Sequence, residues 1–324
     1  MNLNAKIFVA GSTGMVGSSI IRRLKKDGYN NIFYKSRKEL DLTNQKAVHD
    51  FFKNHKFDQL YIAAAKVGGI QANNEYPAEF ISENLLIQTN LITTAFNCKI
   101  KKILFLGSSC VYPKNSSQPI KESDLLNGKL ESTNEAYAIA KIAGIKMCEF
   151  YNKQYSKKHK IDYRSIMPCN LYGPGDNYNT KSSHVIPALI HRFHNAKLKK
   201  INTIKVWGTG KARREFLYVD DLAQACVYLM SIEKKILKKN INNYNGLINV
   251  GSGHDISIMD LANNISKVIG YKGKIQFDKK NFEGVNQKVL DISAMNNLNW
   301  KYKTSLNLGL KKSYNNYLKK IIKS

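Results

Sequence analysis

The sequence has 324 residues, of which 43% are hydrophobic, and this length exceeds the size at which one core keeps growing. We therefore expect one large domain with a smaller lobe, and no apolar run reaches the roughly 20 residues that a membrane helix needs. The formal net charge is +27, but only seven of the 51 basic residues are arginines, the side chain that binds phosphate in a bidentate manner. Because the lysines are spread over every segment, the charge argues against a nucleic-acid-binding role.

The five cysteines are odd in number and form no CxxC pair, so the sequence predicts neither a disulfide framework nor a metal site. The N-terminal run MNLNAKIFVAG leads directly into a strand-like pattern, without a cationic segment and a cleavage site. We expect a cytoplasmic protein that binds an anionic small molecule and contacts neither membrane nor nucleic acid.

Apolar runs alternate with helical patterns along the first half of the chain. Strands are expected at 6–11, 31–35, 59–65, 102–109 and 162–173, and helices at about 15–27, 43–53, 78–97 and 134–157. This alternation is typical of an α/β fold with a doubly wound parallel sheet of the Rossmann type.

The pattern changes after Pro174, where a polar, turn-rich segment follows. It leads to a helix at 184–196, a loop or hairpin at 206–216, a helix at 218–231, a strand at 247–253 and a helix from Ser257, which can cap with Asp260. The sequence predicts a dinucleotide-binding domain of residues 1–173 and 218–251, and a smaller substrate-binding lobe of residues 174–217 and 252–324.

A glycine-rich turn, GSTGMVG, follows the first strand and precedes the first helix. Gly11 allows the tight turn, Gly14 lets the backbone approach a pyrophosphate, and Gly17 permits close packing of the helix. The pyrophosphate of a dinucleotide then lies at the free N–H groups of the helix N-terminus. The sequence therefore predicts a nicotinamide dinucleotide cofactor.

The end of the second strand distinguishes NAD from NADP. An acidic side chain there would bind the 2′-hydroxyl of the ribose, but this sequence has KSRKELDL, with Arg37 at that place and Lys35 nearby. A cation suits a 2′-phosphate, so NADP(H) is the expected cofactor. The alternative is a surface arginine on a loop.

Tyr137 and Lys141 are four residues apart in a predicted helix and therefore lie on one face. A neighbouring ammonium and an oxidised nicotinamide favour the phenolate, so we expect the pKa of Tyr137 to be lowered toward neutrality. Ser108, at the end of a strand, completes a set of hydrogen-bond donors for a substrate carbonyl. Because residues two apart on a strand share a face, Cys110 is expected to face the same pocket.

These motifs resemble those of the extended short-chain dehydrogenase/reductases that act on nucleotide sugars, and the resemblance covers nearly the whole chain. It rests on AAAKVGGI (63–70), FLGSSCVYPK (105–114), YAIAKIAGIK (137–146), MPCNLYGP (167–174), SHVIPAL (183–189) and REFLYVDDLA (214–223). Several of these match the branch that epimerises and reduces GDP-4-keto-6-deoxymannose. The resemblance implies a GDP-linked 4-keto sugar as substrate, NADP(H) as cofactor, and a homodimer that pairs through the helices at 78–97 and 134–157.

Inversion of C3 and C5 beside a C4 ketone needs groups that remove and return protons. A thiol, with an unperturbed pKa of about 8.5, and an imidazole, at about 6.5, can both do so near neutrality. By resemblance, Cys110 and His184 form this epimerisation pair, although Cys110 alone would be a buried thiol and His184 alone a surface or capping histidine. We expect epimerisation first, then hydride transfer to C4 with Tyr137 supplying the proton.

The resemblance also implies the remaining contacts of both ligands. For the cofactor these are Ser12, Thr13, Met15, Val16, Asp41, Leu42, Ala63, Ala64, Leu106, Gly107, Pro168, Asn170 and Leu171, together with Lys141 and His184. For the nucleotide sugar they are Arg192, Trp207, Arg214, Glu283 and Lys288. The alternatives for these are a Trp207 packed in the core and an arginine held in a surface ion pair.

Two departures from the family pattern leave the exact sugar open. Family members often carry an arginine at the position of Thr13, so the preference for NADP depends largely on Arg37, and Glu283 stands where the family has aspartate. Such changes could accompany another sugar, for instance a GDP-4-keto-heptose that is reduced with little epimerisation. A UDP-sugar 4-epimerase and a nucleotide-binding sensor without turnover are further alternatives.

Overall fold

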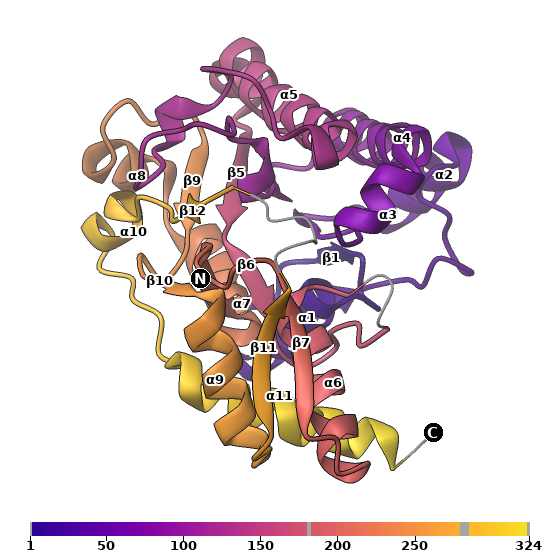
Figure 1. Ribbon diagram of the computed structural model, residues 1–324. Coiled ribbons are helices and arrows are strands. Elements are labelled where there is room, and N and C mark those ends of the chain that lie inside the picture. Colours follow the sequence, from indigo (N-terminus) through magenta and orange to yellow (C-terminus); the bar gives the residue numbers. More distant parts are fainter. Residues whose placement is uncertain (1, 180–182, 279–284, 323–324) are drawn as a thin grey trace.

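The computed structural model describes residues 2–179, 183–278 and 285–322, which form a large α/β domain and a smaller lobe (Figure 1). Six parallel strands make the central sheet in the order β2-β1-β3-β4-β5-β9. Their bounds are β1 (Ile7–Ala10), β2 (Ile32–Phe33), β3 (Gln59–Ile62), β4 (Lys102–Leu106), β5 (Asp162–Pro168) and β9 (Leu247–Val250). The predicted Rossmann-type sheet is confirmed, including the return of the strand near residue 247.

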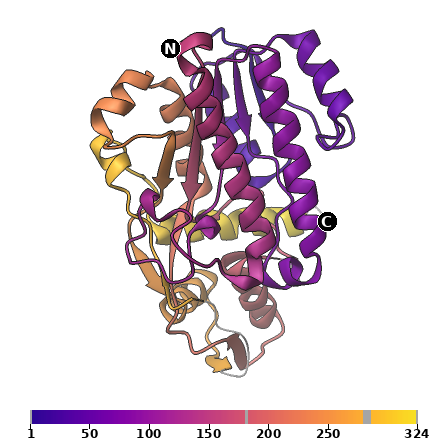
Figure 2. The same cartoon turned by 90° about the horizontal axis from the view of Figure 1, so that it is seen from above.

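Helices cover both faces of this sheet. On one face α1 (Met15–Lys26) packs against α7 (Val219–Ser231), and on the other α4 (Pro77–Asn97) lies between α2 (Gln45–His55) and α5 (Glu135–His159). Figure 2 shows the long helices α4 and α5 side by side across the sheet. Burial from both sides explains why every residue of β1 and β5 is buried and why β1 is wholly apolar. Among the helices of the described residues, none is long and apolar enough to cross a bilayer.

The smaller lobe contains two short sheets and the remaining long helices. In one sheet β8 (Arg213–Tyr218) lies between β10 (Asp255–Ser257) and β12 (Gln287–Lys288) and also pairs with β6 (Asn170–Tyr172), and in the other β7 (Thr203–Trp207) pairs with β11 (Lys274–Asp278). The long helices are α6 (Val185–Leu198), α9 (Ile258–Ile269) and α11 (Leu306–Ile321), and the short ones of the chain are α3 (Ile70–Glu75), α8 (Lys234–Asn240) and α10 (Ser293–Asn297). Ser257 caps α9 by accepting a hydrogen bond from the Asp260 N–H at 3.0 Å, as expected.

The segment 206–216, expected as a loop or hairpin, contains a loop and no hairpin, because β7 pairs with β11 and β8 pairs with β6, β10 and β12. The expected continuation of the fourth strand to residue 109 is wrong. The strand β4 ends at Leu106, before Ser108, and a 3₁₀ turn follows at Ser109–Val111. The Ser108 hydroxyl starts this turn by accepting a hydrogen bond from the Cys110 N–H at 3.3 Å.

Buried apolar side chains form two clusters, one under the large sheet and one in the smaller lobe. Met295 and Trp300 belong to the larger cluster, although the predicted range of the smaller lobe includes them. Conversely, Tyr172 and Tyr218, from the range predicted for the large domain, belong to the smaller cluster. The division into two domains by residue range stays a prediction, and these packing contacts show where its boundaries interleave.

Candidate active site

A cavity of about 1030 Å³ lies where the carboxyl ends of the central strands meet the smaller lobe. This volume is at the upper end of the range for small-molecule sites, as expected for two ligands bound together. Of the predicted site residues, those that line it are Gly11, Thr13, Gly14, Met15, Val16, Arg37, Asp41, Leu42, Ala63, Ala64, Leu106, Gly107, Ser108, Cys110, Tyr137, Lys141, Pro168, Asn170, Leu171, His184, Arg192, Trp207, Arg214 and Lys288. Ser12 and Gly17 do not line it, and Glu283 lies outside the described residues.

The glycine turn lies at the point where the strand order reverses, between β1 and β3. Gly11 has φ +88°, and a Cβ there would stand 2.6 Å from the backbone nitrogen of Ala64. A Cβ on Gly17 would stand 2.1 Å from the carbonyl oxygen of Gly11, so Gly17 allows α1 to pack against the turn and does not itself face the cavity. Around Gly14 the nearest atom is 3.4 Å away, which leaves the backbone open to the cavity.

This turn fits the pyrophosphate of a dinucleotide. Gly14 is the N-cap of α1 and no side chain caps the helix, so the first N–H groups remain available for an anion. The first turn of α1 contains no acidic residue that would repel a phosphate. Ser12 contributes indirectly, because its hydroxyl donates to the carbonyl of Lys35 at 3.1 Å and ties the turn to the end of β2.

Cations stand at the end of β2, where the sequence predicted a 2′-phosphate site. Arg37 lines the cavity, is largely exposed, and places its Nη2 at 3.3 Å from Oε2 of Glu83 on α4. Asp41, in contrast, accepts hydrogen bonds from the backbone N–H and the hydroxyl of Thr43 at 3.0 and 2.8 Å. These bonds lower the pKa of Asp41 and hold it toward the start of α2.

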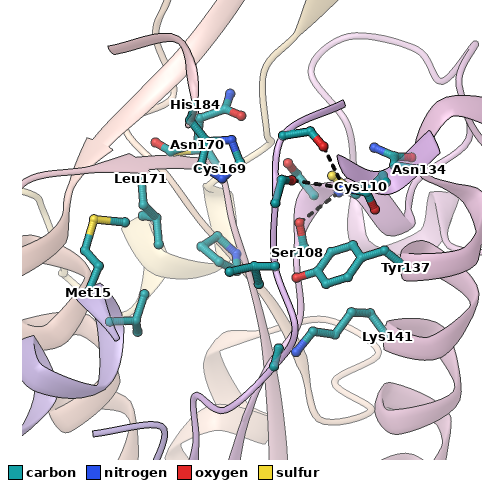
Figure 3. A pocket seen from close by; sticks show the side chains of 18 of the residues that line it. Met15, Ser108, Cys110, Asn134, Tyr137, Lys141, Cys169, Asn170, Leu171 and His184 are labelled. Carbon is teal, nitrogen blue, oxygen red and sulfur yellow. Dashed lines mark hydrogen bonds between the residues drawn. The ribbon is translucent and has the colours of Figure 1, made fainter. Parts of the chain in front are cut away.

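Ser108, Tyr137 and Lys141 come together on one wall of the cavity (Figure 3). The phenol of Tyr137 faces the Ser108 hydroxyl across this wall. One helical turn further along α5, Lys141 donates from Nζ to the carbonyl oxygen of Leu106 at 2.7 Å, and the same Nζ lies 4.8 Å from the ring centre of Phe105. A hydrogen bond to the end of β4 thus fixes Lys141, and Ser108, two residues after that strand, lies next to Tyr137.

Desolvation determines the charge states on this wall. Burial raises the pKa of Tyr137, and the hydrogen bond from Ser108 opposes this only in part. Burial also lowers the pKa of Lys141 from 10.5 to about 7. Desolvation is the dominant effect on both groups in this wall, and the lowered pKa expected for Tyr137 beside an ammonium and an oxidised nicotinamide stays a prediction. Tyr137 is held protonated, which suits a group that gives up a proton.

Cys110 and His184 face the cavity from opposite walls (Figure 3). Cys110 lies in the 3₁₀ turn after β4, is partly exposed, and is beside Asn134 and near Tyr137. His184 is the N-cap residue of α6, and although its side chain reaches solvent, the surrounding protein lowers its pKa by desolvation. Its imidazole is therefore neutral at pH 7 and able to accept a proton.

The smaller lobe brings cations and an indole to the other end of the cavity. Arg214 of β8 is directly opposite Lys288 of β12 in the register of the two parallel strands. Arg192, on α6, donates from Nη2 to the carbonyl oxygen of Lys205. Trp207 is 61% exposed at the end of β7, so it is not a core residue.

Two lining residues were not singled out from the sequence. Asn134 stands three residues before Tyr137, and its Oδ1 is buried without a hydrogen-bond partner among the described residues. Lys66 contacts Glu79 and Glu83, the latter at 2.8 Å, and so reaches the acidic partner of Arg37. Lys66 belongs to the segment AAAKVGGI, and Asn134 stands just before YAIAKIAGIK. Both segments carried the resemblance, and that resemblance was the signal available for finding the two residues.

Comparison with known proteins identifies the relatives of the chain. It is 49% identical over 313 residues to the GDP-L-fucose synthase of Escherichia coli K12, covering 97% of this chain and 96% of that protein. It is 50% identical over 320 residues to GDP-L-fucose synthase 1 of Arabidopsis thaliana, covering 98% and 94%. Among solved structures, a GDP-mannoheptose C4 reductase from Campylobacter jejuni with NADP bound is 38% identical, with a TM-score of 0.87 over 98% of this chain and 99% of that one.

The sequence model of the NAD dependent epimerase/dehydratase family matches residues 7–251, the range that contains the glycine turn, the YxxxK pair and His184. Together with the relatives this confirms the predicted resemblance and a nicotinamide cofactor. The chain belongs to the NAD dependent epimerase/dehydratase family.

Proposed function

We propose that the protein inverts C3 and C5 of GDP-4-keto-6-deoxy-D-mannose and then reduces C4 with NADPH, which gives GDP-L-fucose. One observation carries the proposal: a single cavity is lined by a reductase set, Ser108, Tyr137 and Lys141, and by a second proton-transfer pair, Cys110 and His184. A simple ketoreductase needs no second pair. The name shared by the relatives at 49–50% identity supports the same conclusion.

Epimerisation requires that an α-proton leave one face of the sugar and another arrive on the opposite face. Cys110 and His184, on opposite walls, are suited to these two tasks, with the neutral imidazole accepting or returning a proton. The negative charge that develops on the C4 oxygen is stabilised by hydrogen bonds from Ser108 and Tyr137. One pair of donors therefore serves the enolate of each epimerisation.

Reduction uses the same donors at the same oxygen. When bound, NADPH supplies the hydride that C4 receives. Tyr137, whose pKa is raised by burial, gives its proton to the C4 oxygen, and the Ser108 hydroxyl donates its single hydrogen to the same oxygen. Tyr137 becomes negatively charged once it has given up its proton. Lys141, anchored to the Leu106 carbonyl, balances this charge when its Nζ is protonated.

The cofactor contacts follow from the fit of the turn. The free N–H groups at the N-terminus of α1 would hold the pyrophosphate of NADP(H), and Arg37 and Lys35, which line the cavity, would hold its 2′-phosphate. Arg214 and Lys288 hold the diphosphate of the GDP-sugar, with Arg192 and Trp207 completing that end. The two ligands thus enter from opposite ends and meet at Tyr137.

A second candidate is C4 reduction of a related GDP-4-keto sugar, such as a heptose, with little epimerisation. The solved GDP-mannoheptose C4 reductase at 38% identity favours it, but more weakly than the relatives at 49–50% identity favour the first candidate. In this case Cys110 and His184 would line the cavity without a step to perform.

The test separates the two half-reactions in D₂O. Wild-type protein with NADPH and GDP-4-keto-6-deoxymannose should give product with deuterium at C3 and C5, observed by NMR. Cys110→Ala should lose this exchange yet still reduce a ketosugar that is already epimerised, whereas Tyr137→Phe should exchange but lose hydride transfer by at least about 10²-fold. Turnover of wild-type protein without label would favour the heptose reductase, and undiminished exchange in Cys110→Ala would refute the role of the thiol.

The proposed assembly and location rest on separate observations. We propose a homodimer that pairs through α4 and α5, since Leu86, Ile139 and Phe150 are large apolar side chains exposed on these two helices. A Phe150→Lys variant should shift the mass measured by light scattering toward that of a monomer. A reducing compartment such as the cytoplasm would keep Cys110, like the other four free cysteines, as a thiol.

A further inference from the structure

The two cations proposed for the diphosphate come from strands that are far apart in the sequence. β8 and β12 run parallel, and their register pairs Arg213 with Gln287 and Arg214 with Lys288. Arg214 and Lys288 both line the cavity, whereas Glu215, the next residue of β8, points away from Arg214 and does not line it. The spacing of the two cations therefore depends on the pairing of these strands.

Glu215 is 1% exposed and connects three segments of backbone. Its Oε2 accepts a hydrogen bond from the N–H of Leu290, two residues after Lys288, at 2.9 Å. Its Oε1 accepts from the N–H of Gly253 at 2.7 Å and lies 3.5 Å from the Ser252 hydroxyl. One carboxylate thus holds the chain after β12 and the loop after β9 against β8.

The surroundings leave room for this carboxylate and for little else. A Cβ on Gly251 would stand 2.1 Å from Oε1 of Glu215, so any side chain at that position would displace the carboxylate. The pair that precedes Arg214 and Lys288 is held differently: Asp255 accepts from Arg213 Nη2 at 2.8 Å and from Gln287 Nε2 at 2.6 Å. The buried carboxylate of Glu215 and the partly buried carboxylate of Asp255 thus lie on either side of the cation pair along the two strands.

We propose that Glu215 is a positioning residue for nucleotide-diphosphate binding. It sets the register and spacing of Arg214 and Lys288 by accepting hydrogen bonds from backbone N–H groups in the chain segments on both sides of β8. The proposal rests on the proposed function, since it assumes that these two cations hold the diphosphate of the GDP-sugar. It assigns a role to a buried residue that does not touch either ligand.

The direct test is Glu215→Gln, measured with GDP as the probe. A carboxamide has one acceptor oxygen, so its NH₂ must face the N–H of either Leu290 or Gly253, and one of the two segments is released. We expect the Kd for GDP by calorimetry, and the KM for the GDP-sugar, to rise about tenfold, while kcat changes less than about twofold. The Kd for NADPH should stay within about twofold, because the glycine turn is not involved.

The matched control is Asp221→Asn. Asp221 is also a buried carboxylate whose two oxygens each accept a backbone N–H, from Lys303 at 3.2 Å and Thr304 at 2.9 Å, but none of these three residues lines the cavity. It should lose a similar amount of thermal stability without any change in the Kd for GDP. Equal losses of GDP affinity in both variants would reduce Glu215 to a general stabilising role and overturn the proposal.

A double-mutant cycle shows whether Glu215 acts through Lys288. If it does, Lys288→Ala should weaken GDP binding much less in the Glu215→Gln background than in the wild type, whereas fully additive losses would contradict the proposal. Should Glu215→Gln not fold, Glu215→Asp, which keeps the charge but is one methylene too short to reach both N–H groups, is measured in its place against the same expectations. A wild-type protein that does not bind GDP would refute the proposed function itself, whereas wild-type affinity in a folded Glu215 variant would refute only the positioning role.

Discussion

The two walls of the cavity are built in opposite ways. On the wall of the larger domain, Tyr137 is half-buried and Lys141 is buried on a long helix, and a hydrogen bond ties Lys141 to the end of a central strand. On the wall of the smaller lobe, Trp207 and Arg214 come from short strands that pair with segments far along the chain, and Trp207 is 61% exposed.

This difference separates the chemistry from the recognition of the sugar. Desolvation shifts the pKa of every group of the reductase pair, so small displacements there would change proton transfer. The exposed side chains of the smaller lobe act in contact with water, where salt screens their charges and each single interaction contributes less. We therefore expect substitutions in the wall of the larger domain to have large effects and exposed ones in the smaller lobe to have modest effects.

The largest effect is expected for Gly17→Ala. The new Cβ would stand 2.1 Å from the carbonyl oxygen of Gly11, so the glycine turn must open, and we expect NADPH binding to weaken by more than about 10²-fold with a loss of about 1–3 kcal/mol in stability. Gly14→Ala is the control: its Cβ has 3.4 Å to the nearest atom, so the fold should keep its melting temperature while NADPH binding falls. Fluorescence titration measures NADPH binding and thermal unfolding measures stability for both variants. A Gly17→Ala variant that binds NADPH normally would contradict the rigidity of this wall.

Lys141 should make the stability of the wall depend on pH. Burial lowers its pKa from 10.5 to about 7, so between these pH values the unfolded chain holds a proton that the folded protein has released. Stability therefore rises with pH in this window, by at most about 1.4 kcal/mol per pH unit, and the Lys141→Met variant lacks this contribution. Urea unfolding at pH 7.5 and 9 gives the change in the free energy of unfolding with pH for both proteins. An equal change in the wild type and in Lys141→Met would show that the ammonium is not dehydrated.

Arg37 provides an intermediate case, because it belongs to the larger domain but is exposed. Arg37→Ala should raise the KM for NADPH on the order of tenfold and leave that for NADH within twofold, since only NADPH carries a 2′-phosphate. Thr13→Arg should act in the opposite direction by adding a cation to the glycine turn. Steady-state kinetics with both cofactors decide, and an equal effect on NADH would place Arg37 outside the phosphate site.

The smallest effect is expected for Trp207. Since its side chain is 61% exposed, Trp207→Ala should change the free energy of unfolding by less than about 0.5 kcal/mol while raising the KM for the GDP-sugar a few-fold. The other tryptophan, Trp300, is buried, so quenching of fluorescence by GDP-sugar should occur in the wild type and vanish in Trp207→Phe. Quenching that survives in Trp207→Phe would move the sugar away from β7.

Much of the larger wall could be predicted from the sequence, because short-range geometry determines it. A strand followed by GSTGMVG and a helix makes the phosphate-binding turn wherever it occurs, and Tyr137 and Lys141, four residues apart in a helix, must share a face. Even the shared cavity of Ser108 and Cys110 was expected, although a 3₁₀ turn and not a strand brings them together.

Only the tertiary structure decided the rest. Which distant strands pair is a choice that no local propensity determines. It decides the alignment of Arg214 with Lys288, the support of that alignment by the Glu215 carboxylate, and the formation of a loop and not a hairpin between β7 and β8. The raised pKa of Tyr137 likewise depends on how completely the folded chain removes water from it. Sequence spacing determines local conformation, whereas strand pairing and dehydration arise from the packing of the whole chain.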